Sequence, residues 1–381
     1  MVMHLPSTLL LGALATSSLA SPKPPDRHHG LNLAAKAAGK LWFGTAADIP
    51  GPAGEQQDPY YMKQLLHYKD FGEVTPGNSM KYLYTEPEQG VFNYSDANTF
   101  LKAVHPHGRK RKIRCHNLIW HSEIPDWVTK PATPWTNETL SAALVNHVQN
   151  LVEYFGNTCY SWDVVNEALS DSSSDPAYPY RSVGNPWYQY IGPEYIPMAF
   201  KAAADTIRKC NLDVKLYYND YNIENAGNKS TAAQNLVKEL QSRGIQIDGM
   251  GLESHFTAGD TPSQSAQESN MNAFTALGID VAVTELDVRI VLPTNATNLK
   301  QQAQDYYNTV AACTNVERCV GITVWDFLDT YSWIPIYFKG QGSADIWYQK
   351  NGTAGTPLIR KDGIYFALMQ ALTGRPFSYG S

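Results

Sequence analysis

The sequence lacks several features that would define other classes of protein. None of its five cysteines has the CxxC spacing of a zinc or redox site, so we expect no metal and no cofactor. After residue 20, no apolar run reaches the ~20 residues that a membrane span requires. The net charge is −6 and no basic stripe is present, so neither nucleic acid nor a membrane is an expected partner. The short basic run 109–112 precedes an apolar stretch and is typical of a solvated face.

The first residues have the pattern of a segment that is removed on export. Leu9–Leu19 is a short apolar stretch, and Ser18 and Ala20 are small residues at the −3 and −1 positions of a candidate cleavage site. Residues 1–20 are therefore interpreted as a signal peptide. Residues 21–39 are interpreted as an N-terminal leader, and residues 40–381 as one domain because no linker interrupts them. We therefore expect a secreted, extracellular protein that acts as a monomer. The candidate glycosylation sites are Asn93, Asn137, Asn228, Asn295 and Asn351.

An oxidising compartment would allow the five cysteines to form two disulfide bonds and leave one thiol. Cys313 and Cys319 are close in sequence and flank a polar turn, which makes them the easiest pair. Cys115 and Cys159 each begin one of two consecutive β-like runs, which would place them side by side. Cys210 is then left over.

Short apolar runs alternate with stretches of helical periodicity along the chain. Hydrophobic residues make up 43% of 381 residues, enough for a large core without a metal. Eight strands that alternate with helices predict a parallel sheet closed into a (β/α)₈ TIM barrel. The expected strands are 42–48, 72–78, 112–121, 161–167, 214–221, 249–256, 280–287 and 321–328, and the clearest helices are 140–155, 195–209, 232–243 and 299–312.

Most of these strands end in polar or charged residues. The carboxyl ends of parallel strands meet at one rim of a barrel, where barrel enzymes place their active sites. A single polar strand end is unremarkable, but seven or eight at one rim are hard to explain by packing. The residues concerned are Asp48, Asn78, His121, Asn166, Glu167, Asn219, Asp220, His255, Glu285, Asp287, Trp325 and Asp326.

Two of the strand ends carry glutamates in similar surroundings. The run Trp162–Glu167 passes from buried apolar residues into Asn-Glu, and Val281–Asp287 passes into a carboxylate in the same way. On the fourth and seventh strands, Glu167 and Glu285 would face each other across the barrel mouth. Cleavage of a glycosidic bond needs such a pair, one acid to protonate the leaving oxygen and one carboxylate near the anomeric carbon. At a separation of ~5–5.5 Å the carboxylate attacks directly and the anomeric configuration is retained.

Four motifs resemble glycoside hydrolase family 10, which consists largely of endo-β-1,4-xylanases on a (β/α)₈ barrel. They are WDVVNEA, VTELDV, CHNLIWHSEIPDW and GITVWDFLDTYSW, and the resemblance covers roughly residues 40–375. It implies a single glycosidase domain that hydrolyses internal β-1,4-xylosidic bonds of xylan by double displacement. The expected partner is thus β-1,4-xylan or a xylooligosaccharide.

The resemblance also implies roles for individual residues. Glu167 matches the acid/base and Glu285 the nucleophile. Asn166 matches the residue that bonds the sugar 2-hydroxyl, a contact expected to tighten in the transition state. His255 matches the histidine that bonds the nucleophile, and Asp287 matches the acid that orients this histidine.

Further positions match residues that contact sugars in the family. Sugars present C–H faces that stack on aromatic rings, and their hydroxyls need amide and charged partners. Tyr221 is expected on the leaving-group side, and Trp325 and Trp333 as aromatic walls of the cleft. The substrate-binding residues expected in all are Asn78, Lys81, His116, Trp120, His121, Tyr221, Glu253, Trp325 and Trp333.

Three positions depart from the family pattern. Gly77 stands where the family usually has a glutamate before Asn78, which removes a carboxylate expected at the −2 sugar. Tyr82 replaces a tryptophan. Glu253 stands where glutamine is common, and it either raises pKa values near Glu285 or accepts a hydrogen bond from a sugar hydroxyl.

These departures leave the substrate open between xylan and a plant saponin such as tomatine, which some fungal members of the family deglycosylate by the same mechanism. A non-catalytic carbohydrate-binding barrel would have lost one carboxylate, and both are present. A metal-dependent hydrolase would need ligands grouped at coordination spacing. A glycosidase is therefore the favoured interpretation.

Overall fold

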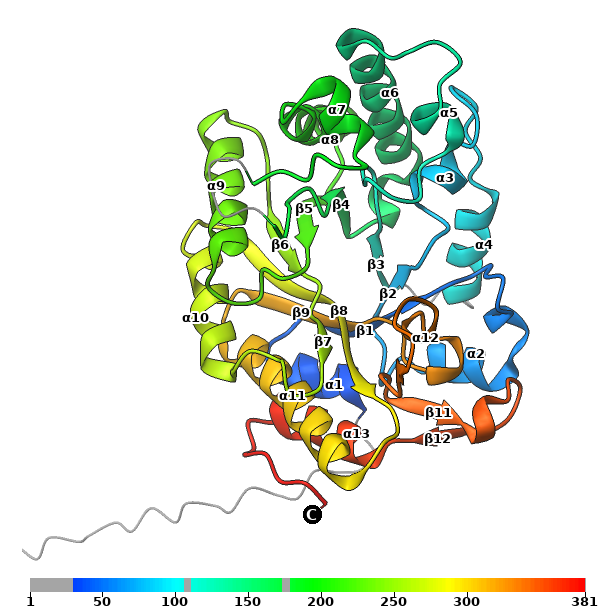
Figure 1. Cartoon of the computed structure of the whole chain (residues 1–381), viewed down its shortest axis with the longest axis vertical. Coiled ribbons are helices and arrows are strands. Elements are labelled where there is room, and N and C mark those ends of the chain that lie inside the picture. The colour runs from blue at the N-terminus through cyan, green and yellow to red at the C-terminus, as the bar shows by residue number, and fades with distance from the viewer. Residues whose placement is uncertain (1–29, 106–110, 173–178, 381) are drawn as a thin grey trace, which may run out of the picture.

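Eight parallel strands close into a barrel in the computed structural model, which describes residues 30–105, 111–172 and 179–380. β1 pairs with β2 on one side and with β9 on the other, and β8 pairs with both β6 and β9, so the ring is complete (Figure 1). The predicted signal peptide and residues 109–110 of the basic run lie outside the described residues. The barrel strands are β1 (Trp42–Ala47), β2 (Glu73–Pro76), β3 (Lys112–Cys115), β4 (Ser161–Asn166), β5 (Lys215–Asp220), β6 (Gly249–Leu252), β8 (Asp280–Val291) and β9 (Cys319–Val324).

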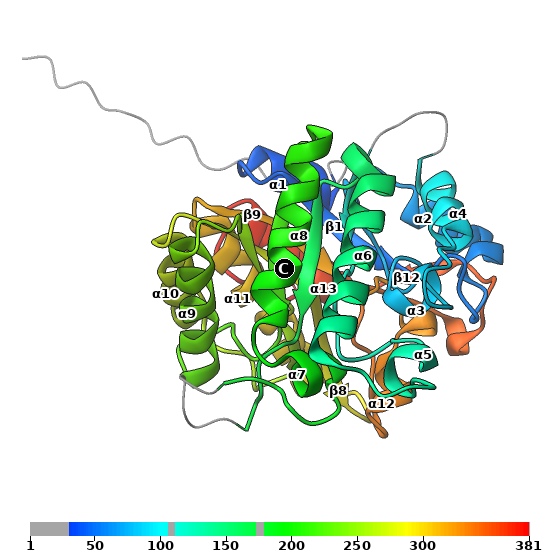
Figure 2. The ribbon, with the colours of Figure 1, turned by 90° about the horizontal axis from the view of Figure 1, so that it is seen from above.

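Helices cover the outside of the barrel, with α9 and α10 on one side and α2 and α4 on the other (Figure 2). No helix of the described part is both long and apolar enough to cross a membrane. The longer helices are α2 (Pro59–Leu65), α4 (Ser95–Val104), α6 (Asn137–Phe155), α8 (Tyr195–Cys210), α9 (Asn228–Ser242), α10 (Gln264–Thr275), α11 (Ala296–Asn315) and α13 (Asp362–Leu372). The short elements are α1 (Leu31–Ala37), α3 (Tyr82–Thr85), α5 (Asp126–Thr129), α7 (Pro186–Ile191), α12 (Ile334–Tyr337), β7 (His255–Thr257), β10 (Gln341–Gly342), β11 (Trp347–Gln349) and β12 (Leu358–Arg360).

The (β/α)₈ prediction is confirmed, and all eight expected strands are present with altered bounds. The third strand ends at Cys115 rather than at residue 121, although Ile119 later forms one bridge with Val165 of β4. The sixth is interrupted at Ser254, whose φ of 64° lies in the left-handed region, and it resumes as β7. Extended backbone cannot continue through that conformation, so the apolar run alone overestimates the strand.

The packed domain begins earlier than the expected boundary at residue 40. Residues 31–37, assigned to the leader, form helix α1, which packs against β1 and α13. Leu31, Ala34 and Ala35 are buried there, and the Leu31 N–H donates to Asp70 Oδ1 at 3.0 Å. This helix has only seven residues, too few to show a helical period in the sequence.

Large side chains fill the lower end of the barrel where neighbouring strands carry glycine. The Trp42 ring lies over Gly321, where an added Cβ would be 2.1 Å from the ring, and the Tyr217 ring lies over Gly249 in the same way at 2.3 Å. Since real Cβ contacts are never this short, only glycine fits at these two positions. The barrel is therefore packed closed below the rim that carries the candidate site.

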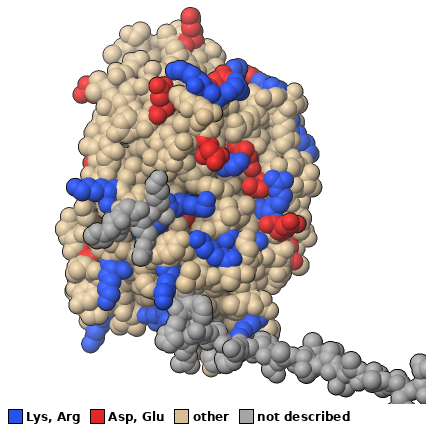
Figure 3. All heavy atoms as spheres, turned by 180° about the vertical axis from the view of Figure 1, so that it is seen from behind, with Lys and Arg blue, Asp and Glu red and all other residues tan. Residues whose placement is uncertain are grey.

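Both predicted disulfide bonds are confirmed, Cys115–Cys159 and Cys313–Cys319, and Cys210 is a free, half-buried thiol. All five candidate glycosylation asparagines are exposed, as a glycan would require. On the face opposite to the view of Figure 1, basic and acidic side chains are scattered among uncharged ones, as on a solvated surface (Figure 3).

Candidate active site

Glu167 follows β4 directly, and the backbone holds it in an uncommon conformation. Its φ of 51° lies in the left-handed region, which costs a residue with a side chain about 1–3 kcal/mol. The Glu167 N–H donates to the Asn219 carbonyl at 2.9 Å, and Arg181 Nε donates to the Glu167 carbonyl at 3.2 Å. These bonds fix the direction in which the carboxyl group leaves the strand.

The environment of Glu167 favours the protonated form. Burial raises the pKa of Glu167 to about 7, and the negative charge of Asp220 adds to the shift. Asn166 Nδ2 lies 3.5 Å from one of its oxygens, and His121 Nε2 lies 3.9 Å from the other. Burial lowers the pKa of His121 to about 4, so this ring is neutral beside Glu167. Glu167 thus has the properties of a general acid at neutral pH.

Glu285 lies on β8, and its surroundings favour the ionised form. Burial alone would raise its pKa, but the hydrogen bond from His255 and the charges near it lower the pKa of Glu285 well below its ordinary range. Arg114 Nη2 donates to Glu285 Oε1 at 3.0 Å, and His255 Nε2 lies 3.2 Å from Oε2. The two glutamates therefore titrate far apart, as an acid and a nucleophile must.

His255 is held between two carboxylates and an indole ring. Its Nδ1 lies 2.7 Å from Asp287 Oδ2, and Trp333 Nε1 donates to the same oxygen at 2.9 Å. The Trp333 ring also packs edge-on against His255, with ring centroids 4.8 Å apart. Burial would lower the pKa of His255, but Asp287 and Glu285 raise it to about 10. The ring is therefore an imidazolium that donates to both acids.

Arg114 and Asp163 are functional residues that the strand pattern did not identify. Arg114 on β3 lies 2.6 Å from Asp163 Oδ2 on β4, and His116 Nδ1 lies 2.8 Å from the same oxygen. The Trp325 ring packs edge-on against His116 at 5.3 Å. A charged residue at the centre of a buried apolar strand is the signal that could have found both, because such a charge must meet a partner inside the barrel.

Asn219 connects the acid side of the site to the nucleophile side. Its Nδ2 lies 2.8 Å from Asn166 Oδ1 and 2.9 Å from Glu285 Oε1, and Thr284 Oγ1 donates to its Oδ1 at 2.7 Å. Because the amide is fixed from both ends, Asn166 and Glu285 keep a set relative position.

The residues around Gly77 form a second polar group on the rim. Asn78 Nδ2 donates to Asp48 Oδ2 at 2.9 Å, Lys81 Nζ donates to Asn78 Oδ1 at 2.8 Å, and the Lys81 ammonium lies 4.8 Å from the Trp120 ring centroid. A Cβ on Gly77 would lie 3.5 Å from the Cβ of Asp48. Asp48 directly follows β1. Its carboxylate therefore lies close to where a glutamate side chain at position 77 would begin.

Two tyrosines named from the sequence, Tyr82 and Tyr221, contact groups other than the two glutamates. Tyr82 is buried and stacks on His147 with ring centroids 3.4 Å apart, so its replacement of a tryptophan changes the core and not the cleft. Tyr221 lies at the rim, where its hydroxyl bonds Arg181 Nη2 at 2.7 Å and Asp171 Oδ2 at 2.5 Å. These two contacts fix the position of its hydroxyl group.

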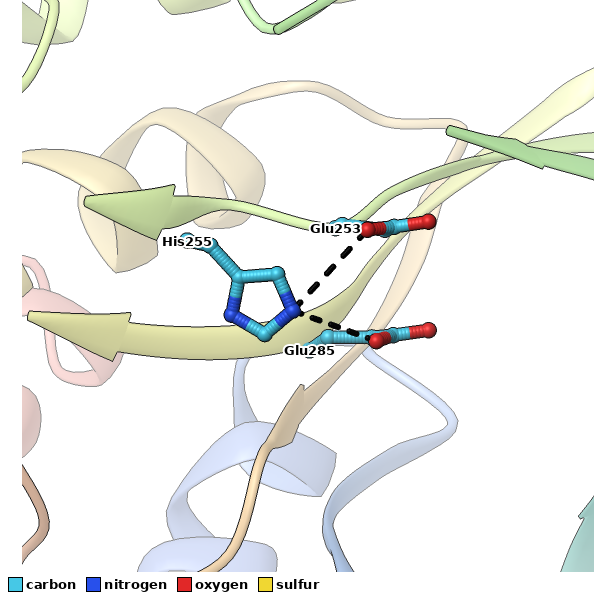
Figure 4. Close-up of side chains that lie close together, drawn as sticks. All are labelled: Glu253, His255 and Glu285. Atoms are coloured by element: carbon cyan, nitrogen blue, oxygen red, sulfur yellow. Dashed lines mark hydrogen bonds and ion pairs between the residues drawn. The ribbon is translucent and has the colours of Figure 1, made fainter. Parts of the chain in front are cut away.

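Glu253, His255 and Glu285 form a compact group (Figure 4). One oxygen of each glutamate and Nε2 of His255 all lie within 4.8 Å of one another. An imidazolium has no free lone pair, so a protonated His255 cannot ligate a cation. The arrangement suits hydrogen bonding and proton chemistry.

A buried glutamate pair with separated pKa values, at the strand ends of a (β/α)₈ barrel, defines a glycosidase of the two-carboxylate class. The comparisons with known proteins agree. The sequence pattern of glycosyl hydrolase family 10 matches residues 30–355, and the chain belongs to this family.

Several relatives are curated as xylanases. The chain is 47% identical to endo-1,4-beta-xylanase D of Talaromyces funiculosus over 83% of its length and 73% of the relative. It is 38% identical to endo-1,4-beta-xylanase A of Humicola insolens over 98% of its length and 96% of the relative. Among solved structures, the family 10 xylanase from Bispora sp. MEY-1 with xylobiose is 60% identical, with a TM-score of 0.86 over 90% of this chain and 99% of that one.

Proposed function

We propose that the protein is a secreted endo-1,4-β-xylanase that cleaves internal xylosidic bonds with retention of configuration. The observation that carries the proposal is the pair of glutamates with opposite protonation, Glu167 with a pKa of about 7 and Glu285 with a pKa well below its ordinary range. The xylanase relatives and the xylobiose complex of the Bispora enzyme support xylan as substrate. Two disulfide bonds and exposed glycosylation sequons support secretion.

In the first step, Glu285 attacks the anomeric carbon while Glu167 transfers its proton to the leaving oxygen. A bond forms between a Glu285 oxygen and the sugar as the glycosidic C–O bond breaks, and the oxocarbenium-like transition state is stabilised by the carboxylate. His255 and Arg114 each hold one Glu285 oxygen, so the nucleophile is aimed before substrate arrives.

The second step depends on a change of charge at Glu285. Once Glu285 is an ester its negative charge is gone, so the pKa of Glu167 falls and Glu167 accepts a proton from water. The water oxygen attacks the anomeric carbon from the side that the leaving sugar occupied, and the bond between that carbon and the Glu285 oxygen breaks, which restores the Glu285 carboxylate. The two inversions give net retention.

The sugar-binding groups lie around this pair. Asn166 is placed beside Glu167 to bond the 2-hydroxyl, and Trp325 and Trp333 carry their rings next to His116 and His255. On the far side, Asp48, Asn78 and Lys81 offer a charged and polar wall for the −2 sugar. We infer that Asp48 supplies the carboxylate at the −2 sugar that Gly77 cannot supply.

Product analysis on xylan, with a proton NMR time course, tests the proposal. We expect xylooligosaccharides whose β-anomer appears before mutarotation, and a loss of turnover in Glu285→Gln of at least about 10⁴-fold, since the covalent route is removed. The variant Glu239→Gln, which changes a surface ion pair, is the control. Full hydrolysis by Glu285→Gln, or the α-anomer first, would contradict the mechanism. Sugar release from α-tomatine and none from xylan would favour the saponin substrate.

A further inference from the structure

Glu253 is a buried carboxyl group directly beside the nucleophile. It follows the last residue of β6 and is 2% exposed. Its backbone joins the neighbouring strands, because its N–H donates to the Asp220 carbonyl and its carbonyl accepts from the Glu285 N–H. In Figure 4 its carboxyl group lies above that of Glu285, with His255 reaching toward both. An ionised Glu253 would therefore repel the ionised nucleophile at close range.

The hydrogen-bond donors near Glu253 are already engaged by other groups. Among the described residues, Asn219 Nδ2 is the donor in contact with it, at 3.0 Å from Oε1. The same nitrogen also faces Asn166 and Glu285, so three oxygens share its two N–H bonds. His255 Nε2 lies 3.9 Å from Glu253 and only 3.2 Å from Glu285, so its proton goes to Glu285. Glu253 thus lacks the partners that a buried anion requires.

The balance of buried charges also disfavours an anion at Glu253. The cations Arg114 and His255 face three carboxylates, those of Asp163, Glu285 and Asp287, so the cluster already carries one excess negative charge. An ionised Glu253 would add a second. Each unpaired buried charge is costly, and such a group takes up a proton instead.

More distant charges do not change this result. Lys229 is a cation that acts on Glu253, but it is already paired with Asp220 at 2.8 Å and with Asp171 at 2.9 Å. Burial, followed by the charges of Glu285 and Glu167, raises the pKa of Glu253 well above its ordinary value. The titratable groups that act on Glu253 are Glu167 after β4, Asp220 on β5, Lys229 in α9, His255 on β7 and Glu285 on β8, and Glu224 accepts from the N–H of the next residue, Ser254.

We infer that Glu253 is held as a neutral carboxylic acid in the resting enzyme and acts as a positioning residue for Glu285. The protonated acid is an uncharged group of nearly the same shape as a glutamine side chain, with one donor and one acceptor. The kinetic part of this inference rests on the proposed glycosidase function. The protonation state itself does not.

Infrared difference spectroscopy tests the protonation state without substrate. Wild type minus Glu253→Gln, near pH 6, should show the C=O stretch of a protonated carboxylic acid, and that band should move in D₂O. Wild type minus Glu239→Gln should show only the bands of an ionised carboxylate, because Glu239 is in a surface ion pair. Ionised-carboxylate bands in the Glu253 difference spectrum would overturn the inference, whether or not the protein cleaves xylan.

The pH dependence of kcat/KM provides the kinetic test. If Glu253 is neutral, Glu253→Gln should keep the alkaline limb of the profile within about 0.3 pH unit of wild type, since no charge near Glu167 is lost. Glu253→Ala should lose at least about tenfold, because its cavity frees Asn219 and Glu285. An alkaline limb displaced toward lower pH by about one unit in Glu253→Gln would mean that a negative charge had been removed, and would overturn the inference.

Discussion

Replacement of Asp287 by asparagine separates the charge of this group from its shape. Asp287 Oδ2 accepts from both His255 Nδ1 and Trp333 Nε1, while the buried Oδ1 has no hydrogen-bond partner among the residues that the structure describes. The asparagine oxygen should therefore take the Oδ2 position and keep both bonds, and the NH₂ group should face the unpartnered side. His255 then keeps its Nδ1 proton but loses the negative charge that stabilises the imidazolium.

The pKa shift of His255 gives the scale of the expected loss of activity in Asp287→Asn. The pKa of His255 stands at about 10 against an ordinary 6.5, and at 1.36 kcal/mol per unit the whole shift corresponds to roughly 5 kcal/mol. Glu285 supplies part of the upward shift and burial opposes it, so this figure sets only the scale of the Asp287 contribution. Loss of one charge-assisted hydrogen bond costs about 1.5–3 kcal/mol. We therefore expect kcat/KM on an aryl xylobioside to fall about 10- to 150-fold in Asp287→Asn.

The pH profile distinguishes this explanation from a general loss of structure. In the variant the pKa of His255 falls, so above that lower pKa the ring is neutral and turns a lone pair toward Glu285. Activity should then decline from a lower pH than in wild type. Asp280→Asn, near the start of the same strand, removes an outer ion pair with Arg318 and should leave the profile unchanged. An Asp287→Asn enzyme within about twofold of wild type would refute the proposed role of the charge.

Three further predictions concern other parts of the molecule. Because Glu167 must be protonated and its pKa is about 7, kcat/KM should fall as pH rises through about 7, and Glu167→Gln assayed on an activated aryl glycoside should lose that limb. Removing Cys115–Cys159, which spans 44 residues, should lower the free energy of unfolding by about 4 kcal/mol, against about 2 kcal/mol for Cys313–Cys319, which spans 6; equal losses in denaturant titrations would contradict the loop-entropy reasoning. Asp48→Ala should raise KM for xylotriose about tenfold with little change in kcat, whereas Gly77→Ala should be nearly neutral because its Cβ meets only ordinary contacts; unchanged KM in Asp48→Ala would remove Asp48 from the binding site.

The sequence predicted best those features that depend on the ends of buried strands. Glu167 was identifiable because it directly follows a run of β-forming residues, and Glu285 because a carboxylate interrupts such a run, although β8 continues past it to Val291. The Cys115–Cys159 bond was predicted because both cysteines were expected on adjacent strands, and the two strands are adjacent, although Cys115 ends β3 and Cys159 precedes β4.

Features that depend on which way a side chain points were not predictable in this way. Arg114 and Asp163 are central residues of short strands, and only the closed barrel shows that both face its interior. Tyr82 begins a helix of four residues, too short for its period to reveal the buried face. The interruption at Ser254 depends on a single backbone torsion, which alternation of residue types does not report.

The contact between Trp42 and Gly321 has a consequence for how this barrel can vary. These residues are paired across β1 and β9, the first and last strands of the ring, and Trp42 Nε1 also donates to Thr323 Oγ1 at 3.1 Å. A side chain at position 321 is compatible only with a smaller residue at position 42, so the two positions should covary among homologues although 278 residues separate them. The same contact fixes the register between β1 and β9, where the barrel closes. A circularly permuted form, cut in a loop far from this junction, should therefore close its barrel more readily than one in which Trp42 has been trimmed.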